Sequence, residues 1–208
     1  MAKFWGKETA DRLTGSSDAD SIYGGGGNDS LAGGLGNDYL NGGAGDDWLG
    51  DPYSGDAGND TMHGGTGNDQ LFGGAGNDWL DGGADNDTIK GGRGDDTMIG
   101  GAGDDWLIDT LRDDGRDLFI PGAGNDHMVS YYDATTDIFR MQAAPGGFGH
   151  DEIQYFERGI DRIEFQGYTA RGMSVSTTQT GTVFSFRDGS SLTVDATGLQ
   201  AGRDYVFT

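Results

Sequence analysis

The chain repeats itself every nine residues, and this period restricts its fold more than any other feature. From Gly24 onward the units follow the pattern G-G-x-G-x-D-x-U-x, in which U is an apolar residue; GGAGNDWLD at Gly73–Asp81 is one example. Similarity at a short fixed period is typical of solenoids, in which each unit packs only against its neighbours. The sequence therefore predicts a stack of equivalent coils.

The register extends beyond the regular units and survives three insertions, at 51–54, 109–111 and 130–145. The sixth position is Asp in every unit: Asp11, Asp20, Asp29, Asp38, Asp47, Asp60, Asp69, Asp78, Asp87, Asp96, Asp105, Asp117, Asp126 and Asp151. The eighth is apolar: Leu13, Ile22, Leu31, Leu40, Leu49, Met62, Leu71, Leu80, Ile89, Met98, Leu107, Phe119, Met128 and Ile153. A disordered Gly/Asp-rich linker has no reason to keep both columns in phase.

Each unit contains a turn and a short strand. Glycines at positions 1, 2 and 4 suit a tight turn, and in a strand over positions 7–9 the eighth side chain points inward. Two units make one coil, which predicts an all-β fold, a parallel β-roll (a two-sheet β-helix solenoid). Thr182–Val194, with a turn at Asp188-Gly189, predicts a C-terminal β-hairpin cap. We expect degenerate repeats over 1–23, the roll over 24–154 and the cap over 155–208.

The thin core of such a roll does not fold the chain by itself. Burying one Leu contributes roughly 1.5–3 kcal/mol, whereas ordering nine backbone residues costs on the order of 9–18 kcal/mol. Hydrogen bonds between coils recover about 1 kcal/mol each. Stacking also aligns the sixth-position aspartates in two like-charged rows, so the fold requires a cation.

The available ligands select that cation. Carboxylates and backbone carbonyls are hard oxygen donors that favour Ca²⁺ over Zn²⁺ or Cu²⁺, and Mg²⁺ fits a carbonyl-rich cage poorly. The three histidines occupy three different repeat positions, which argues against a transition-metal site. The net charge of −22 corresponds to 11 divalent ions (22 divided by two), about one for each gap between turns.

Composition excludes several classes of function. Thirty-five acidic against thirteen basic residues make nucleic acid and anionic membranes improbable partners. No stretch approaches the roughly 20 apolar residues of a membrane span. The absence of cysteine excludes disulfides and thiolate zinc sites. The first residues, MAKFWGKETADRLTG, lack the apolar run of a cleaved signal peptide, which by itself favours a cytoplasmic protein.

The repeats resemble those of the RTX family of bacterial proteins exported by type I secretion. The resemblance implies that each Ca²⁺ lies between turns 18 residues apart. One turn supplies its sixth-position carboxylate and the backbone carbonyls of positions 2 and 4. The turn 18 residues later supplies its own carboxylate and the carbonyls of positions 1 and 3. The implied ligands are Asp20, Gly25, Gly27, Asp29, Gly34, Gly36, Asp38, Gly42, Ala44, Asp47, Gly58, Asp60, Gly65, Gly67, Asp69, Gly74, Gly76, Asp78, Gly82, Ala84, Asp87, Gly91, Arg93, Asp96, Gly100, Ala102, Asp105, Asp117, Asp126 and Asp151.

Departures from the repeat mark weaker sites. Lys7, Thr9, Ser16 and Asp18 replace glycines in the first two units, so we expect looser turns there. Asp85 replaces a fourth-position glycine, where only its carbonyl is needed. The insertion 51–54 is expected to bulge from a turn, and 112–114 leave the neighbouring site in doubt.

The C-terminus resembles the family as well. Asp151–Phe165 is similar to the segment that ends many RTX rolls, and Tyr205–Phe207 resembles the aromatic tail of the uncleaved export signal. The resemblance thus implies an extracellular protein without a cleaved N-terminal signal. The alternative is that this segment only covers the open end of the roll.

The sequence contains no H-E-x-x-H or G-x-S-x-G motif, and we expect no enzymatic activity. Exposed aromatic residues at position 7 (Tyr39, Trp48, Trp79 and Trp106) are either products of duplication or a surface for another subunit or a sugar polymer. We therefore expect an extracellular structural or self-assembling protein. The expected self-assembled form is a homo-oligomer or filament in Ca²⁺. The alternatives are a polysaccharide-binding accessory module and a fragment of a secreted RTX enzyme.

Overall fold

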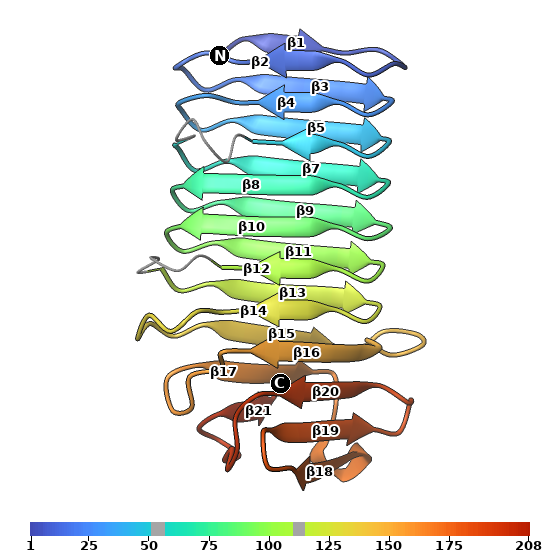
Figure 1. Cartoon of the computed structure of the whole chain (residues 1–208), viewed down its shortest axis with the longest axis vertical. Coiled ribbons are helices and arrows are strands. Elements are labelled where there is room, and N and C mark those ends of the chain that lie inside the picture. The colour runs from blue at the N-terminus through green and yellow to red at the C-terminus, as the bar shows by residue number, and fades with distance from the viewer. Residues whose placement is uncertain (51–56, 110–114) are drawn as a thin grey trace.

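The computed structural model describes residues 1–50, 57–109 and 115–208. Its strands are stacked like rungs, with the N-terminus at the top, and each coil contributes one strand to each of two sheets (Figure 1). Within the repeats every neighbouring pair of strands is parallel. The predicted all-β parallel β-roll is therefore confirmed.

Sheet 1 has ten strands. In spatial order they are β1 (Lys3–Trp5), β3 (Ser21–Gly26), β5 (Tyr39–Ala44), β7 (Thr61–Thr66), β9 (Trp79–Ala84), β11 (Thr97–Ala102), β13 (Leu118–Ala123), β15 (Ile138–Gln142), β17 (Arg162–Gln166) and β21 (Tyr205–Phe207). Many of these strands are six residues long, because they continue from positions 7–9 of one unit through positions 1–3 of the next. The sequence predicted only the first half of each.

Sheet 2 has eleven strands. From the N-terminal end they are β2 (Arg12–Thr14), β4 (Ser30–Ala32), β6 (Trp48–Leu49), β8 (Gln70–Ala75), β10 (Thr88–Arg93), β12 (Trp106–Ile108), β14 (His127–Val129), β16 (His150–Gln154), β20 (Ser191–Val194), β19 (Thr182–Phe186) and β18 (Met173–Thr177). A short 3₁₀-helix, η1 (Ala170–Gly172), precedes β18. We call the turns that lead from sheet 1 to sheet 2 the outgoing turns and those that lead back the returning turns.

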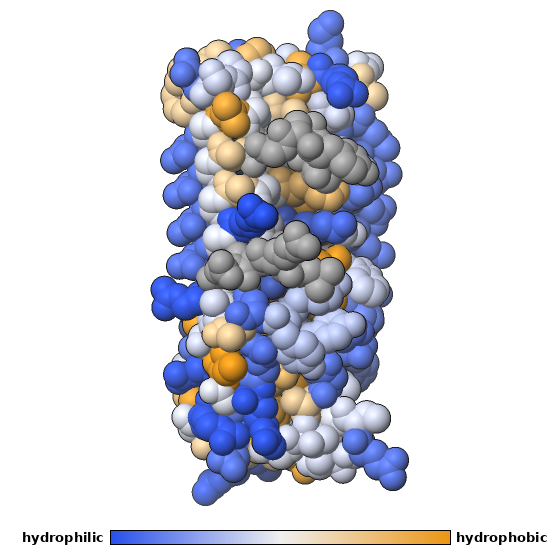
Figure 2. Space-filling model, turned by 60° about the vertical axis from the view of Figure 1, so that its left-hand side comes forward, coloured by the Kyte–Doolittle hydropathy of each residue, from blue (hydrophilic) through white to orange (hydrophobic). Residues whose placement is uncertain are grey.

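The core is the predicted column of eighth-position residues. From Ile22 to Ile153 each of these side chains is fully buried between the two sheets. Phe4 and Leu13, in the first coil, are only partly buried. In the face shown in Figure 2, hydrophilic residues lie mainly along both edges of the roll, with intermediate and hydrophobic residues between them.

The structure differs from the prediction between residues 130 and 145. The sequence treats this stretch as an excursion, but it contains β15, whose Phe139 pairs with Phe119 and is fully buried in the same core column. The nonapeptide glycines are missing here, so the search by pattern passes over a coil that the strand ladder preserves. The predicted bulge at 51–54, residues 110–111 of the second insertion and 112–114 lie outside the described residues.

The C-terminal cap contains the predicted hairpin. Strands β19 and β20 are antiparallel, and the turn between them includes Gly189 at φ +100°. A further antiparallel strand, β18, which the sequence did not predict, pairs with β19. Aromatic side chains including Phe148, Phe165, Phe184 and Phe186 fill the end of the core beneath these strands.

Candidate metal sites

The sixth-position aspartates form one column in the outgoing turns and another in the returning turns. From Asp20 onward the Oδ1 atom of each accepts a hydrogen bond, 2.6–3.2 Å long, from a backbone N–H one coil earlier on the same side. The acceptors are Asp29, Asp47, Asp69, Asp87, Asp105, Asp126 and Asp151 in the outgoing turns, and Asp20, Asp38, Asp60, Asp78, Asp96, Asp117, Asp137 and Asp161 in the returning turns. This bond fixes the orientation of each carboxylate.

In nine of these carboxylates the second oxygen is buried without a hydrogen-bond partner among the described residues. The Oδ2 atoms concerned are those of Asp29, Asp38, Asp47, Asp69, Asp78, Asp87, Asp105, Asp126 and Asp151. An ionised carboxylate buried in this way is costly unless a cation or donor compensates it. The roll therefore contains two rows of oxygen atoms that lack a partner on the side facing the next turn.

From Asp29 to Asp105 a small space lies beside each of these oxygens, and the first-position glycine keeps it open. A Cβ atom added to Gly64 would lie 2.3 Å from Asp69 Oδ2 and 2.5 Å from the carbonyl oxygen of Gly82 in the next turn. Both distances are far too short for real contacts, although the backbone of Gly64 has no left-handed φ. Glycine is needed here for space, and the atoms around that space are oxygens.

The carbonyls assigned from the resemblance face the same gaps. In the first regular gap, carbonyl oxygens of Gly25 and Gly27 point down toward Gly43 and Gly45 of the next turn. From that turn the carbonyl of Gly42 points back toward Gly24, and the carbonyl of Ala44 accepts the N–H of Gly27 at 2.8 Å. Carboxylate and carbonyl oxygens of two turns thus converge, as a Ca²⁺ site requires.

All of the predicted ligands lie in the described turns, and the turns are paired as predicted. Gly76 donates to the carbonyl of Arg93 at 2.8 Å, and Gly67 donates to that of Ala84 at 3.2 Å. Asp85 has the left-handed backbone that its glycine neighbours adopt, with φ 76°. The ligand assignment itself remains a prediction.

Asp20 differs from the other predicted ligands. Its Oδ2 accepts hydrogen bonds from the backbone N–H and the hydroxyl of Ser16, both at 2.8 Å. These bonds lower the pKa of Asp20, for which the bond from the Ala2 backbone is the largest cause. The serine that replaces a glycine in this unit therefore supplies donors where the central turns leave an oxygen for a cation.

In the central turns the pKa values of the aspartates are raised instead of lowered. Burial, reinforced by neighbouring aspartates of the same column, raises the pKa of Asp69 to about 7 and that of Asp87 to about 8. The pKa of Asp151 rises to about 9 for the same reasons. Each backbone N–H that donates to Oδ1 opposes the rise without cancelling it. A divalent cation between the turns stabilises the ionised form directly.

Two aspartates of the returning column were missed by the sequence analysis. Asp137 accepts the N–H of Asp117 at 2.9 Å, and Asp161 accepts the N–H of Asp137 at 3.2 Å. The signal was present as Asp-x-apolar in Asp137–Phe139 and Asp161–Ile163, but it lacked the glycines used to find the register. Asp109, Asp133 and Asp137 also bring carboxylate oxygens within 4.8 Å of one another, beside the returning turns.

A second ladder, at position 5, was also missed. In the outgoing turns the side-chain oxygen of Asn68 accepts the backbone N–H of Asn86 at 3.1 Å, and the oxygen of Asn86 accepts the N–H of Asp104 at 2.7 Å. The same arrangement links Asn59 to Asn77 at 2.9 Å in the returning turns. Position 6 accepts from the turn before and position 5 from the turn after, so the two ladders join adjacent turns in opposite senses.

Comparison with known proteins agrees with this geometry. The family model described as the RTX calcium-binding nonapeptide repeat (4 copies) matches residues 5–40, 26–49, 54–89 and 81–108. The chain carries RTX calcium-binding repeats. Ca²⁺ is therefore the cofactor, bound between turns of the RTX roll, and several ions fit the repeated gaps.

One solved structure resembles the RTX roll in fold. The extracellular lipase LipA of Serratia marcescens matches 95% of this chain with a TM-score of 0.51 and 18% identity, and the chain spans 40% of that lipase. The AlgE6R3 subunit of the mannuronan C5-epimerase of Azotobacter vinelandii matches 96% of this chain and 78% of that one at 19% identity, with a TM-score of 0.21. A comparison with curated protein sequences gave no match.

Aromatic side chains at the outer faces of the RTX roll are stacked in pairs, although Trp5 and Trp106 remain 66% and 44% exposed. Trp5 is stacked on Tyr23 with ring centroids 4.1 Å apart, Trp106 on His127 at 4.5 Å, and Trp48 on Phe72 at 4.9 Å. Trp48 and Trp106 belong to sheet 2 and Trp79 to sheet 1. None of the helices in the described part of the chain has the length and apolar character of a membrane span.

Proposed function

We propose that this protein works outside the cell as a calcium-folded structural roll that associates with further copies of itself, and that it is not an enzyme. The observation that carries the proposal is the row of buried Oδ2 atoms without partners in the central turns. They connect folding to calcium concentration, which is low in the cytosol and high outside. The chain then remains unfolded during export and folds on release.

Type I secretion through the C-terminal segment is the export route that we propose. The segment Asp204–Thr208 contains β21, whose Phe207 ring lies 5.5 Å from that of Phe165. The same residues are therefore available as an unfolded signal inside the cell and become part of the cap outside it.

A secretion assay in cells that contain a type I exporter tests this route. We expect the full chain in the medium and the chain without Asp204–Thr208 inside the cells. Gly64→Ala, which impairs the roll but keeps the C-terminus, serves as a control and should still be exported. Secretion of the truncated chain at the normal level would contradict the route and leave the tail as a structural cap.

Self-association is supported by the edges of the sheets. Strand β18 has a neighbour on one side only, and four of its five residues are exposed. It is antiparallel to β19, which is antiparallel to β20, so it runs in the same direction as β2 at the other end of sheet 2. Addition of β2 of a second copy to β18 would therefore continue the sheet, and such head-to-tail contacts generate filaments.

Sedimentation of the calcium-loaded chain at high concentration tests this contact. We expect oligomers in calcium and not in chelator, and fewer oligomers for Val175→Lys, which places a charge on exposed β18. Thr193→Lys adds the same charge on β20, inside the sheet, and should leave association unchanged. A strictly monomeric wild-type chain in millimolar calcium would contradict self-association.

A second candidate is a calcium-dependent module of a larger secreted enzyme. It is favoured by the likeness of fold to a lipase of which this chain spans 40%. The polysaccharide-binding module is less favoured, because the acidic roll repels acidic glycans. Hydrolysis of ester substrates by the calcium-loaded chain would contradict the proposal that it is not an enzyme.

A further inference from the structure

The residue at position 2 of a turn, four residues before the column aspartate, separates two classes of turn. In the first class this residue is a glycine with a left-handed backbone, at φ between +83° and +121°. The Oδ2 atom of the aspartate then has no hydrogen-bond partner among the described residues. The aspartates of this class are Asp29, Asp38, Asp47, Asp69, Asp78, Asp87, Asp105, Asp126 and Asp151. We call these the open turns.

In the second class the position-2 residue is not glycine, and its own backbone N–H donates to Oδ2 of the aspartate four residues later, at 2.7–2.8 Å. The pairs of this class are Lys7 with Asp11, Ser16 with Asp20, Glu157 with Asp161, and Gln200 with Asp204. None of the four donors has a left-handed φ. We call these the closed turns.

The backbone of position 2 explains the difference. The φ of Gly25 is +108°, and going from an ordinary negative φ to such a value turns the peptide between positions 1 and 2 over by about half a rotation, as between type I and type II turns. The N–H of that peptide then points away from the aspartate. Residues with a Cβ rarely adopt this φ, so a lysine, serine, glutamate or glutamine at position 2 keeps its N–H on the carboxylate.

The Oδ1 atom has the same role in both classes. In the closed turns Oδ1 of Asp161 accepts the N–H of Asp137 at 3.2 Å. Likewise, Oδ1 of Asp20 accepts the N–H of Ala2 at 2.6 Å. The coils are therefore joined in the same way in both classes, and the classes differ in the Oδ2 atom, which in the open turns faces the gap.

The closed turns lie at the two ends of the molecule. Asp11 and Asp20 precede β2 and β3, and Asp161 and Asp204 precede β17 and β21, the last two strands of sheet 1. The turn before them is closed by a side chain, because the hydroxyl of Ser130 donates to Oδ2 of Asp137 at 2.5 Å. Residues 56 and 113, at position 2 of two further turns, lie outside the described residues.

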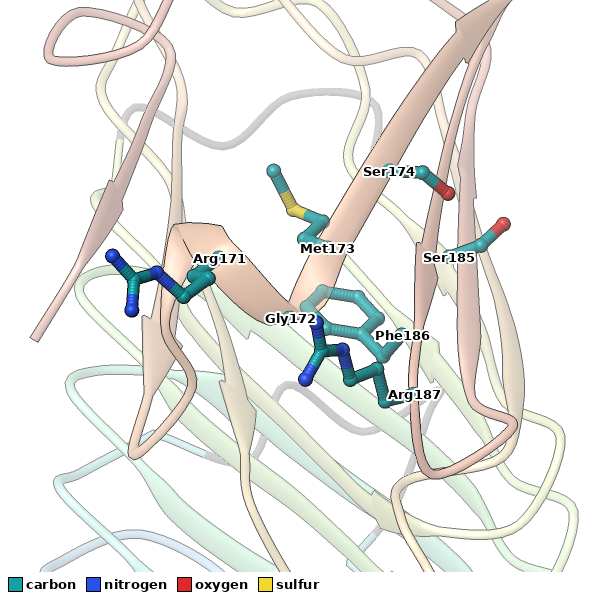
Figure 3. A pocket seen from close by; sticks show the side chains of 7 residues that line it. All are labelled: Arg171, Gly172, Met173, Ser174, Ser185, Phe186 and Arg187. Atoms are coloured by element: carbon teal, nitrogen blue, oxygen red, sulfur yellow. The ribbon is translucent and has the colours of Figure 1, made fainter.

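The hairpin beyond the last closed turn offers no replacement for the calcium gaps. The open groove on β18 and β19 is lined by Arg171 and Arg187 and by no carboxylate (Figure 3). A groove with two guanidinium groups and no acidic ligand does not suit Ca²⁺. The gaps of the roll are therefore the part of the described chain in which the position-2 residue matters.

We propose that the position-2 residue determines whether a turn offers a calcium site. A left-handed glycine leaves Oδ2 to the ion, whereas a residue with an ordinary backbone occupies Oδ2 with its own N–H, whose partial positive charge repels a cation. The gaps that follow the turns of Asp11, Asp20, Asp161 and Asp204 then bind no Ca²⁺, and Asp20 is not a ligand. Position 2 thus sets the length of the calcium ladder, whether or not the chain is exported or self-associates.

The first test creates a site. Ser16→Gly places glycine at position 2 of the Asp20 turn and removes the hydroxyl that also donates to Oδ2, so we expect this variant to bind one Ca²⁺ more than the wild type. Ser17→Gly adds a glycine to the same turn at position 3 and is the matched control, which should leave the number unchanged. Native mass spectrometry of the full chain in calcium counts the bound ions as whole numbers.

The second test removes a site. Gly25→Ser puts serine at position 2 of the open Asp29 turn and should bind one ion fewer than the wild type. Gly26→Ser adds the same side chain at position 3, where other turns carry Leu35 or Thr66, and should keep the full number. Circular dichroism in calcium verifies that each variant is folded. If Gly25→Ser does not fold, Ser16→Gly decides alone.

Three results would overturn the proposal. An unchanged number of ions in folded Ser16→Gly would show that position 2 does not open the site. An additional ion in Ser17→Gly would give the role to the glycine content of the turn instead of to position 2. A full number of ions in folded Gly25→Ser would show that a residue with a side chain at position 2 does not exclude the ion.

Discussion

The central turns and the two ends of the molecule satisfy the same carboxylate in different ways. In the centre, Asp69 and Asp87 each have one oxygen bonded to the neighbouring turn and one buried without a partner. At the N-terminal end both oxygens of Asp20 accept hydrogen bonds from protein donors. At the C-terminal end Asp204 forms an ion pair with Arg203. Calcium dependence is therefore a property of the glycine-rich turns and not of every coil.

Removal of calcium is expected to have the largest effect and to separate these regions. In chelator the central columns repel, and a core of one side chain per strand does not compensate. The cap keeps its aromatic core of Phe148, Phe165, Phe184 and Phe186. We expect circular dichroism to show most β-structure lost, and hydrogen exchange to show residual protection mainly in β18–β20 of the cap, with the secretion segment Asp204–Thr208 unprotected.

Equal concentrations of magnesium should not restore the roll, because Mg²⁺ retains its waters in a carbonyl-rich site. A full β-signal in chelator, with uniform protection along the chain, would contradict the argument that calcium provides the missing stability.

Much of this architecture could be predicted from the sequence, and the omissions have physical causes. The Asp column at position 6 and the apolar column at position 8 predicted the sheets, the core and the calcium-binding turns, because each position has the same role in every coil. Asp137 and Asp161 were missed because a coil without glycines still stacks through its strand. The position-5 ladder was missed because Asn and Asp at a turn also suit a local turn bond, and only the stacked structure shows that their partners are in the next coil.

A methyl group in the calcium space is the next largest perturbation. Gly64→Ala places a Cβ 2.3 Å from Asp69 Oδ2, whereas Gly172→Ala in the cap meets no atom closer than 3.9 Å, and neither glycine has a left-handed φ. We expect Gly64→Ala to raise the calcium midpoint of folding by well over about tenfold and Gly172→Ala to leave it unchanged. Equal midpoints, measured by circular dichroism, would show that the space at position 1 is not used by the ion.

Removing one charge without changing shape should have a smaller effect. Asp69→Asn keeps an oxygen for the N–H of Asp47 but loses the charge that faces the gap, so we expect the calcium midpoint to rise by about tenfold, or 1.4 kcal/mol. Asp20→Asn, whose second oxygen faces Ser16, should change it by less than about twofold. Similar shifts for the two variants would erase the distinction between centre and end.

Acid should partly replace calcium in the central turns. The folded-state pKa values of Asp69, Asp87 and Asp151 are raised to about 7, 8 and 9, so their contribution to the stability of the calcium-free fold is complete below the ordinary value of 3.8 and is lost as pH rises through 7 to 9. Asp20, whose pKa is lowered, has the opposite sign: its contribution is present above 3.8 and is lost as pH falls. In chelator, β-structure should therefore increase between pH 9 and pH 4, and a decrease would refute the sign.

The smallest expected effect tests whether the two ladders of the central turns have separate roles. The side-chain oxygen of Asn68 accepts the N–H of Asn86 at 3.1 Å, while the neighbouring Gln70 is exposed and its side chain forms no hydrogen bond with another described residue. Asn68→Ala should lower the free energy of unfolding in calcium by about 1 kcal/mol without changing the number of ions bound, and Gln70→Ala should change neither. Chemical denaturation and calorimetric titration measure the two quantities. Loss of one bound ion in Asn68→Ala would mean that position 5 belongs to the calcium site and that the ladders act as one.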